Sequence, residues 1–307
     1  MKTKSQKINA KWTAGDIPDQ TGRTAVITGA NSGIGYETAK ALAEKNARVI
    51  LGCRSMDKGE AALERIKSDL PDADVSLIPL DLANLASVKG FTEKIRSAND
   101  RLDILVNNAG VMVPPYGKTT DDFELQMGTN HLGHFALTLR LLPLLISTPG
   151  SRVVAVSSLA HRGGNINFND LHWESRKYKP WRAYGDSKIA NLLFMRGLVH
   201  RLEESGAAVT VAAAHPGWTA TELQRHTGLT SALNPVFAQN TEMGALPSLY
   251  AACGPDVENN AFYGPCGLLE FRGYPRQVNA ISRAKDDAAA ERLWSLSESL
   301  TGVTYES

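Results

Sequence analysis

The chain has 307 residues, 43% of them apolar, and a formal net charge of +1 at pH 7. That length and apolar content favour one α/β domain with a C-terminal elaboration, and the near-neutral charge excludes a broad basic field for nucleic acid or an anionic membrane. The first twenty residues are polar and contain no apolar stretch of signal-peptide or membrane-anchor length. We therefore expect a solvated polar arm over residues 1–20 and a single domain over residues 21–307.

Short β-branched runs alternate with longer helical patterns along the whole chain. Strands are expected over residues 24–28, 49–53, 75–80, 104–107, 152–157 and 209–214, with a seventh near Phe262. Helices are expected over residues 36–45, 57–70, 85–98, 122–145, 183–204, 242–252 and 286–300. This repetition, with nearly continuous apolar strands, is typical of a doubly wound parallel sheet covered by helices on both faces.

Ligands of such sheets bind outside the carboxyl ends of the strands. The residues that follow the expected strands are Gly29, Arg54, Asp81, Asn108, Ser158 and Pro216. Two stretches interrupt the alternation: a polar insertion at residues 159–182 and a segment at residues 218–240 after the last regular strand. Both are longer than most connections in α/β units. We expect them to be substrate loops beside the ligand site.

The first strand runs into a glycine-rich turn, TGANSGIG, at residues 28–35, and an amphipathic helix follows it directly. Glycines let the backbone approach a ligand closely, and the helix start offers unpaired N–H groups that favour a phosphate. A dinucleotide is thus the first ligand to consider, although glycine-rich turns also occur as plain left-handed turns or helix starts. The candidate contacts are Gly29, Asn31, Ser32, Gly33, Ile34 and Gly35.

A second group of candidates surrounds Tyr184 and Lys188, which are four residues apart and share one face of a helix. A phenol is a poor acid or base at neutral pH, but a neighbouring ammonium stabilises the phenolate and lowers the phenol pKa. Ser158 can offer a hydroxyl to the same substrate oxygen, although a serine at a strand end is also a common turn residue or cap. Taken alone, the pair also fits a partly buried tyrosine beside an exposed lysine.

Two further patterns follow from the fourth strand and the next helix. Short side chains at Asn108, Ala109 and Gly110 would let a flat cofactor ring lie against the backbone. Asn130 lies inside an expected helix, where a polar side chain must face water or serve a buried network.

Together these motifs resemble the short-chain dehydrogenase/reductase family over about residues 20 to 300. The resemblance rests on TGxxxGxG, NNAG, the in-helix Asn, the Ser after the fifth strand, YxxxK and the His-Pro-Gly at residues 215–217, in the family order. NSGIGYETAKALA, NHLGHF, YGDSKIANLLF and HPGWTATEL look most similar to the retinol dehydrogenase-type branch, whose relatives include the protochlorophyllide reductases. The resemblance implies a single-domain Rossmann-type sheet of about seven strands and an active enzyme.

The resemblance also implies residue roles. Tyr184 would be the general acid/base, Lys188 would lower its pKa and bind the cofactor ribose, and Ser158 would orient the substrate oxygen. Asn130 would hold a water that links Lys188 to bulk solvent. The implied reaction interconverts an alcohol and a carbonyl by hydride transfer to or from a nicotinamide.

The end of the second strand bears on cofactor choice. NAD-selective folds place an acidic residue there, but the sequence at residues 52–55 is Gly-Cys-Arg-Ser. Arg54, followed by Ser55, suits a 2′-phosphate, so we expect NADP(H) in preference to NAD(H); its other role would be a solvated arginine at a helix start. Asp81 and Leu82 resemble the pair that contacts adenine, and Asp81 could equally cap the next helix. The segment that closes over the nicotinamide would use Pro216, Gly217, Trp218, Thr219 and Thr221.

The aromatic and aliphatic content of the two expected substrate loops favours a bulky apolar alcohol or carbonyl. Two alternatives stay open: a light-dependent double-bond reductase of the protochlorophyllide type, and a non-catalytic NADP-sensing scaffold. Family members often form homodimers or homotetramers through the helices expected here at residues 122–145 and 183–204.

Neither cysteine nor histidine spacing indicates a metal site. Cys53, Cys253 and Cys266 form no CxxC pattern, and no carboxylate or cysteine lies at ligand spacing from His131, His134 or His161. We expect free thiols, no metal and a cytoplasmic chain.

Overall fold

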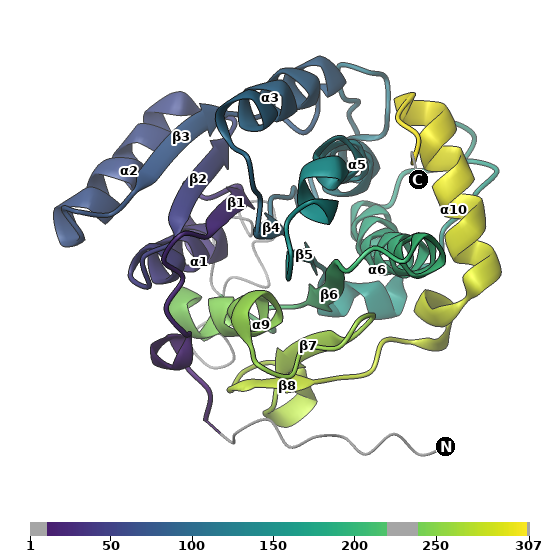
Figure 1. The fold of residues 1–307 in the computed structure, drawn as a ribbon. Coiled ribbons are helices and arrows are strands. Elements are labelled where there is room, and N and C mark those ends of the chain that lie inside the picture. Colours follow the sequence, from purple (N-terminus) through teal and green to yellow (C-terminus); the bar gives the residue numbers. More distant parts are fainter. Residues whose placement is uncertain (1–10, 220–238, 306–307) are drawn as a thin grey trace.

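Eight strands form one sheet in the computed structural model, which describes residues 11–219 and 239–305. Their order across the sheet is β3-β2-β1-β4-β5-β6-β7-β8, and all neighbouring pairs are parallel except β7 with β8 (Figure 1). The bounds are β1 Thr24–Thr28, β2 Arg48–Cys53, β3 Val75–Pro79, β4 Ile104–Asn107, β5 Arg152–Val156, β6 Thr210–Ala214, β7 Phe262–Pro265 and β8 Pro275–Gln277. The strand order reverses between β1 and β4, as in other doubly wound sheets.

Helices cover both faces of this sheet (Figure 1). The helices α1, α2 and α9 pack on one face, and α3, α5 and α6 pack on the other, where α10 lies against α6. The bounds are α1 Gly33–Ala43, α2 Met56–Asp69, α3 Leu85–Ala98, α4 Leu125–Met127, α5 Gly133–Ile146, α6 Pro180–Ser205, α9 Thr241–Cys253 and α10 Asp287–Thr301. The expected fold class and the seven expected strands are confirmed. Apolar runs that are buried on both faces favour central parallel strands.

The structure departs from the expected elements in two places. The helix expected over residues 122–145 consists of α4, a π-helical turn at Gly128–Leu132, and α5. Apolar periodicity does not separate a π-helical turn from the α-helix around it. An eighth strand, β8, was not expected, since it has three residues and begins with a proline, which disfavours a strand.

Residues 11–20 pack more closely against the domain than a solvated polar arm would. Trp12 and Ile17 are 5% and 3% exposed. The Trp12 indole meets the ring of Tyr250 in α9 edge-on, with centroids 5.1 Å apart. Two apolar side chains can anchor a segment whose average composition is polar, and residues 1–10 lie outside the described part.

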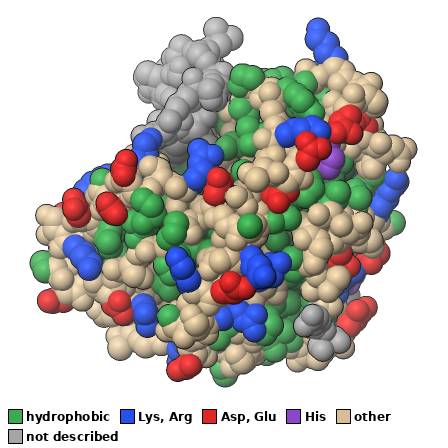
Figure 2. Space-filling model, turned by 90° about the horizontal axis from the view of Figure 1, so that it is seen from above, with side chains coloured by type: hydrophobic (Ala, Val, Ile, Leu, Met, Phe, Trp, Pro, Cys, Tyr) green, Lys and Arg blue, Asp and Glu red, His purple; other side chains and the backbone are tan. Residues whose placement is uncertain are grey.

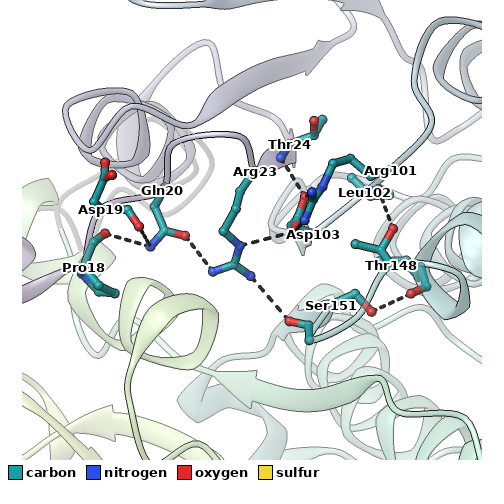
Figure 3. A network of polar contacts seen from close by, with 12 residues as sticks. Pro18, Asp19, Gln20, Arg23, Thr24, Arg101, Leu102, Asp103, Thr148 and Ser151 are labelled. Atoms are coloured by element: carbon teal, nitrogen blue, oxygen red, sulfur yellow. Dashed lines mark hydrogen bonds and ion pairs between the residues drawn. The ribbon is translucent and has the colours of Figure 1, made fainter.

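A buried carboxylate, Asp103, joins strand starts at the edge of the sheet opposite the carboxyl ends (Figure 3). It accepts the backbone N–H of Thr24 at 2.9 Å and forms ion pairs with Arg101 at 2.7 Å and Arg23 at 3.4 Å. Burial alone would raise the pKa of Asp103, but the hydrogen bond from Arg101 and the other partners outweigh it and lower that pKa. This network fixes the starts of β1 and β4.

The surface carries mixed charge. On the face shown in Figure 2, Lys and Arg side chains are interspersed with Asp and Glu, in keeping with the net charge of +1. Across residues 11–219 and 239–305, we find no helix with both the length and the apolar character needed to cross a membrane.

Candidate active site

A cleft of about 880 Å³ opens at the carboxyl ends of the parallel strands, lined by residues that follow β1 to β6. Tyr184, Lys188 and Ser158 line it. So do the cofactor candidates Gly29, Asn31, Ser32, Gly33, Ile34, Gly35, Arg54, Ser55, Asp81, Leu82, Asn108, Ala109, Gly110, Pro216, Gly217, Trp218 and Thr219. Asn130 is fully buried behind the lining, and Thr221 lies outside the described residues.

The glycine turn packs directly against the segment that follows β4. Gly29 and Gly33 have φ values of 67° and 57°, which glycine adopts without strain. A Cβ on Gly29 would stand 2.9 Å from that of Ala109, and a Cβ on Gly35 would overlap the Gly29 carbonyl. Ser32 precedes α1 without capping it through its side chain, so it does not compete with a phosphate for the first N–H groups of the helix.

The Thr28 hydroxyl joins three elements beneath the cleft. It accepts the backbone N–H groups of Asn108 and Ala109, both at 2.9 Å, and lies 2.9 Å from His134 Nε2. His134 Nδ1 lies 3.0 Å from the Asn130 carbonyl oxygen, which can only accept, so Nδ1 carries the ring proton and Nε2 takes the Thr28 proton. Burial lowers the pKa of His134 to about 4, so the ring is neutral. Sequence reasoning missed this network.

Tyr184 and Lys188 lie one turn apart in α6, and both are buried beside the cleft. Ser158 lies two residues after the end of β5, and its hydroxyl acts on the Tyr184 pKa by favouring the phenolate. The Lys188 ammonium lies 5.6 Å from the Tyr184 ring centroid and donates to the Val156 carbonyl oxygen at 3.2 Å. The fold thus brings Ser158, which is distant in sequence, next to Tyr184 and Lys188, which are four residues apart.

Burial dominates the protonation of this pair. It raises the pKa of Tyr184 to about 12, against the hydrogen bond from Ser158, and it lowers the pKa of Lys188 to about 8. Burial thus raises the phenol pKa above its ordinary value in this structure, and the expectation that Lys188 lowers it stays a prediction. At neutral pH the phenol is protonated and the lysine is charged.

Asn130 serves a buried network, one of the two alternatives that its position left open. Its Oδ1 accepts the Val111 backbone N–H at 2.8 Å. Its Nδ2 donates to the Val111 carbonyl oxygen at 3.0 Å and to the Ser187 hydroxyl at 2.9 Å. The amide therefore ties the segment after β4 to the helix that carries Tyr184 and Lys188.

A cationic group lies at the end of the cleft that follows β2. Arg54 lines the cleft there with Lys58, and Ser55 caps α2 by accepting the Lys58 backbone N–H at 3.5 Å. The cap of α3 is Asn84 rather than Asp81, which accepts an N–H within the preceding loop. The capping role considered for Asp81 is therefore wrong, since α3 begins at Leu85.

Only the two ends of the insertion at residues 159–182 reach the cleft, through Leu159, Ala160, Gly163 and Trp181. Its middle is anchored elsewhere, because the Tyr178 hydroxyl donates to Glu124 Oε1 and accepts from Gln126 Nε2, both at 2.8 Å. Of the expected loop at residues 218–240, the structure describes only 218–219 and 239–240. Sequence reasoning missed the apolar lining residues Val111, Met112, Pro114 and Phe271.

The cysteines and histidines play no joint role as ligands in the described ranges. All three cysteines are free thiols. Within residues 11–219 and 239–305, no group of three or more His, Cys, Asp or Glu side chains is placed to hold a metal ion. The buried His131 instead lies 2.8 Å from the Ser297 hydroxyl of α10.

Comparison with known proteins matches this geometry. A family model described as short chain dehydrogenase matches residues 23–231. The chain is 42% identical to human retinol dehydrogenase 13 over 303 residues, which cover 95% of this chain and 89% of that protein. The solved structure of an uncharacterised protein from Mycobacterium paratuberculosis is 43% identical, with a TM-score of 0.83 over 97% of this chain and 100% of that one.

A short-chain dehydrogenase from Shigella flexneri, solved in complex with NADP, is 25% identical, with a TM-score of 0.62 over 76% of this chain and 93% of that one. The family match covers more than half of the chain, and the similarity to a retinol dehydrogenase spans nearly all of it. This chain therefore belongs to the short-chain dehydrogenase/reductase family of oxidoreductases.

Proposed function

We propose that the protein is an NADP(H)-dependent oxidoreductase that interconverts an alcohol and a carbonyl on a bulky apolar substrate. The observation that carries the proposal is the meeting of Tyr184, Ser158 and Lys188 in one cleft with the glycine turn. When bound, the nicotinamide cofactor supplies or accepts the hydride.

The lining of the cleft fits a dinucleotide, and a volume of about 880 Å³ suits a ligand of that size. The glycine turn and the start of α1 would hold the pyrophosphate. The segment Asn108–Gly110, fixed by the Thr28 hydroxyl, would support the nicotinamide half together with Lys188. Residues 216–219, which also line the cleft, would cover that half, and Thr221 stays a candidate for the same role.

The chain's own residues would handle the proton. Tyr184, protonated because of its raised pKa, would donate to the substrate oxygen during reduction and accept its proton during oxidation. Ser158 would hold the same oxygen by a hydrogen bond. The charged Lys188 favours the phenolate as the proton leaves. Asn130 fixes the wall behind Lys188, and its role in holding a water stays a prediction.

The preference for NADP(H) over NAD(H) rests on Arg54. Its position after β2, beside Lys58 and without an acidic residue at 52–55, suits a 2′-phosphate. The NADP complex of the Shigella relative supports the same choice.

The substrate side of the cleft is apolar, with Met112, Pro114, Leu159, Trp181 and Phe271 in its lining. A retinoid, steroid-like or lipid-derived carbonyl fits this lining, and the relative named retinol dehydrogenase supports it. For the light-dependent alternative, none of the three cysteines lines the cleft as the described residues form it. The scaffold alternative is disfavoured because Ser158, Tyr184 and Lys188 are all present.

A panel of apolar ketones, aldehydes and alcohols, followed at the NADPH absorbance with NADH in parallel, tests the proposal. Turnover of bulky apolar carbonyls with NADPH is expected in the dark. Reduction that needs light and a pigment would favour the protochlorophyllide-type alternative, and tight NADPH binding without any turnover would favour the scaffold.

The cytoplasmic location and the homodimer or homotetramer stay proposals. The helices α5 and α6 are buried over most of their length within one chain, and α10 packs on α6. Pairing through these helices would therefore find little exposed apolar surface on them.

A further inference from the structure

The turn between β7 and β8 contacts, through one carboxylate, two segments that line the cleft: the turn after Ser158 and residues 215–219. Glu270 Oε2 lies 3.1 Å from His215 Nε2 and 2.8 Å from Arg162 Nη2. Arg162 belongs to the 3₁₀ turn that begins directly after Ser158, and His215 directly precedes Pro216. Glu270 therefore joins the segment that carries the candidate substrate-orienting hydroxyl to the segment that would cover the nicotinamide.

The protonation states in this contact follow from its hydrogen bonds. The Gly217 backbone N–H donates to His215 Nδ1 at 3.2 Å, so Nε2 carries the ring proton and donates it to Glu270. The His215 side chain is fully buried, and that of Glu270 is 14% exposed. Burial alone would raise the pKa of Glu270, but the hydrogen bond from His215 and the charge of Arg162 outweigh it and lower that pKa. Both contacts are thus charge-assisted, which makes them strong.

The backbone of the turn is shaped around this contact. Leu269 and Glu270 have φ values of 54° and 62°, which residues other than glycine keep only where their surroundings impose them. On the neighbouring strand, a Cβ on Gly264 would overlap the His215 imidazole. Only a glycine at that position leaves room for His215 to reach Glu270.

The same turn holds the backbone of residues 216–218. The Phe271 carbonyl oxygen accepts the Trp218 N–H at 2.8 Å, and the two rings meet edge-on with centroids 5.7 Å apart. Gly217 has a φ of 67°, and a Cβ there would overlap the Phe271 carbonyl. Gln239 donates to the Pro216 carbonyl oxygen at 2.8 Å and accepts the N–H of Gly273, in the turn, at 3.0 Å.

We propose that Glu270 is a positioning residue that sets the wall of residues 215–218 relative to the turn after Ser158, and thereby the placement of the nicotinamide half of the cofactor. Glu270 does not line the cleft, so it acts through His215 and Arg162. The inference rests on the proposed function of the cleft as an NADP(H) site.

Two ligands separate this role from a general loss of structure. NADPH carries the nicotinamide, whereas 2′-phospho-ADP-ribose has the same phosphates and adenosine but lacks that ring. Glu270→Gln keeps the size of the side chain and an acceptor for His215, but it removes the charge that faces Arg162. We expect it to weaken NADPH binding about tenfold. Binding of 2′-phospho-ADP-ribose should stay within about twofold, since its contacts lie at the glycine turn and Arg54.

Matched variants identify the partner through which Glu270 acts. Arg162→Met should reproduce part of the loss in NADPH affinity, and Arg162→Lys should restore most of it. In the double variant with Glu270→Gln, Arg162→Met should add little, because both changes break one contact. Glu291→Gln breaks the ion pair with Arg201 at 2.9 Å, away from the cleft, and should change neither affinity.

The outcomes are distinct. If Glu270→Gln weakens the binding of both ligands equally, the turn acts only on stability. If NADPH binding is unchanged in both Glu270→Gln and Arg162→Met, the contact positions nothing. Either result overturns the inference. A wild-type protein that binds 2′-phospho-ADP-ribose but gains no affinity from the nicotinamide also overturns it. If the wild type binds neither ligand, the proposed function fails, and the inference fails with it.

Discussion

The Lys188 ammonium lies 5.6 Å from the centroid of the Tyr184 ring, and it donates a hydrogen bond to the Val156 carbonyl oxygen at 3.2 Å. The lysine is thus held by the last residue of β5, and Ser158 follows two residues after that strand ends. The hydrogen bond to Val156 holds the ammonium beside the Tyr184 ring.

Tyr184→Phe removes only the phenol oxygen from the cleft. We expect carbonyl turnover to fall by at least about 10²-fold, because proton transfer to the substrate oxygen is lost, while NADPH affinity from fluorescence titration is retained. Tyr116→Phe, which alters a phenol that is 44% exposed, is the matched control and should keep full activity. Substantial turnover in Tyr184→Phe would remove Tyr184 from the proposed mechanism.

The pKa of Lys188, lowered by burial to about 8, predicts the alkaline limb of the reductive rate. Turnover should decline as pH rises through about 8, because the lysine loses its charge there while the phenol, with a pKa of about 12, stays protonated. In Lys188→Met the residual rate should show no such limb. A limb that is identical in both proteins would assign it to another group.

The same lowered pKa predicts how stability changes with pH. Between about 8 and the ordinary value of 10.5, the unfolded state binds more protons at Lys188 than the folded state does. The contribution of this site to the free energy of unfolding therefore rises with pH across that window. Urea unfolding of wild type and Lys188→Met at several pH values gives the free energy of unfolding of each protein as a function of pH. The difference between the two dependences on pH measures the contribution of Lys188. A difference of the opposite sign would show that burial does not lower this pKa.

Arg54 should decide between the two nicotinamide cofactors. Loss of a charge-assisted contact to a 2′-phosphate in Arg54→Ala should weaken NADPH by about 10- to 100-fold and leave NADH nearly unchanged. Arg48→Ala is the control, since Arg48 begins the same strand, β2, at its opposite end. The preference is wrong if wild-type protein binds NADH as tightly as NADPH.

The elements around the cleft could be predicted because local signals specify them. Buried apolar runs indicate central strands, and the glycine turn marks where β1 passes into α1. Because parallel strands end at one edge, the residues after them were expected to meet, and the structure places them in one cleft. Tyr184 and Lys188 share a helical face for the same local reason.

The contacts that fix the cleft depend on tertiary packing, which leaves no local pattern. His134 has no metal-ligand spacing and no other role in the sequence, and only the fold brings it to Thr28, 106 positions earlier. Glu270 lies 55 positions after His215 in a turn with no recognisable motif. The raised pKa of Tyr184 likewise follows from burial, and burial is a property of the packed structure.

The insertion at residues 159–182 should depend on Glu124 for its position. Glu124 is buried and accepts the Tyr178 hydroxyl at 2.8 Å. Tyr178→Phe removes that bond while keeping the ring, so we expect a loss of about 1 kcal/mol in unfolding free energy and earlier proteolysis within the insertion. NADPH binding should be unaffected, since residues 164–180 do not line the cleft. Weakened cofactor binding would contradict this separation.

At the opposite edge of the sheet, Asp103 should dominate local stability, because its side chain is 1% exposed and faces Arg23, Arg101 and a backbone N–H. Asp103→Asn keeps the shape but loses the charge, and we expect a loss of about 1–3 kcal/mol at neutral pH. Its pKa is lowered below the ordinary 3.8, so the stabilisation is present above that pH and is lost as pH falls below it. Urea unfolding should therefore show that the difference in unfolding free energy between wild type and variant becomes smaller in acid.

Asp74→Asn is the control for burial: it breaks the exposed pair with Arg48 at 3.8 Å and should cost less than about 0.5 kcal/mol. Equal losses for the two variants would show that burial adds nothing to the Asp103 network.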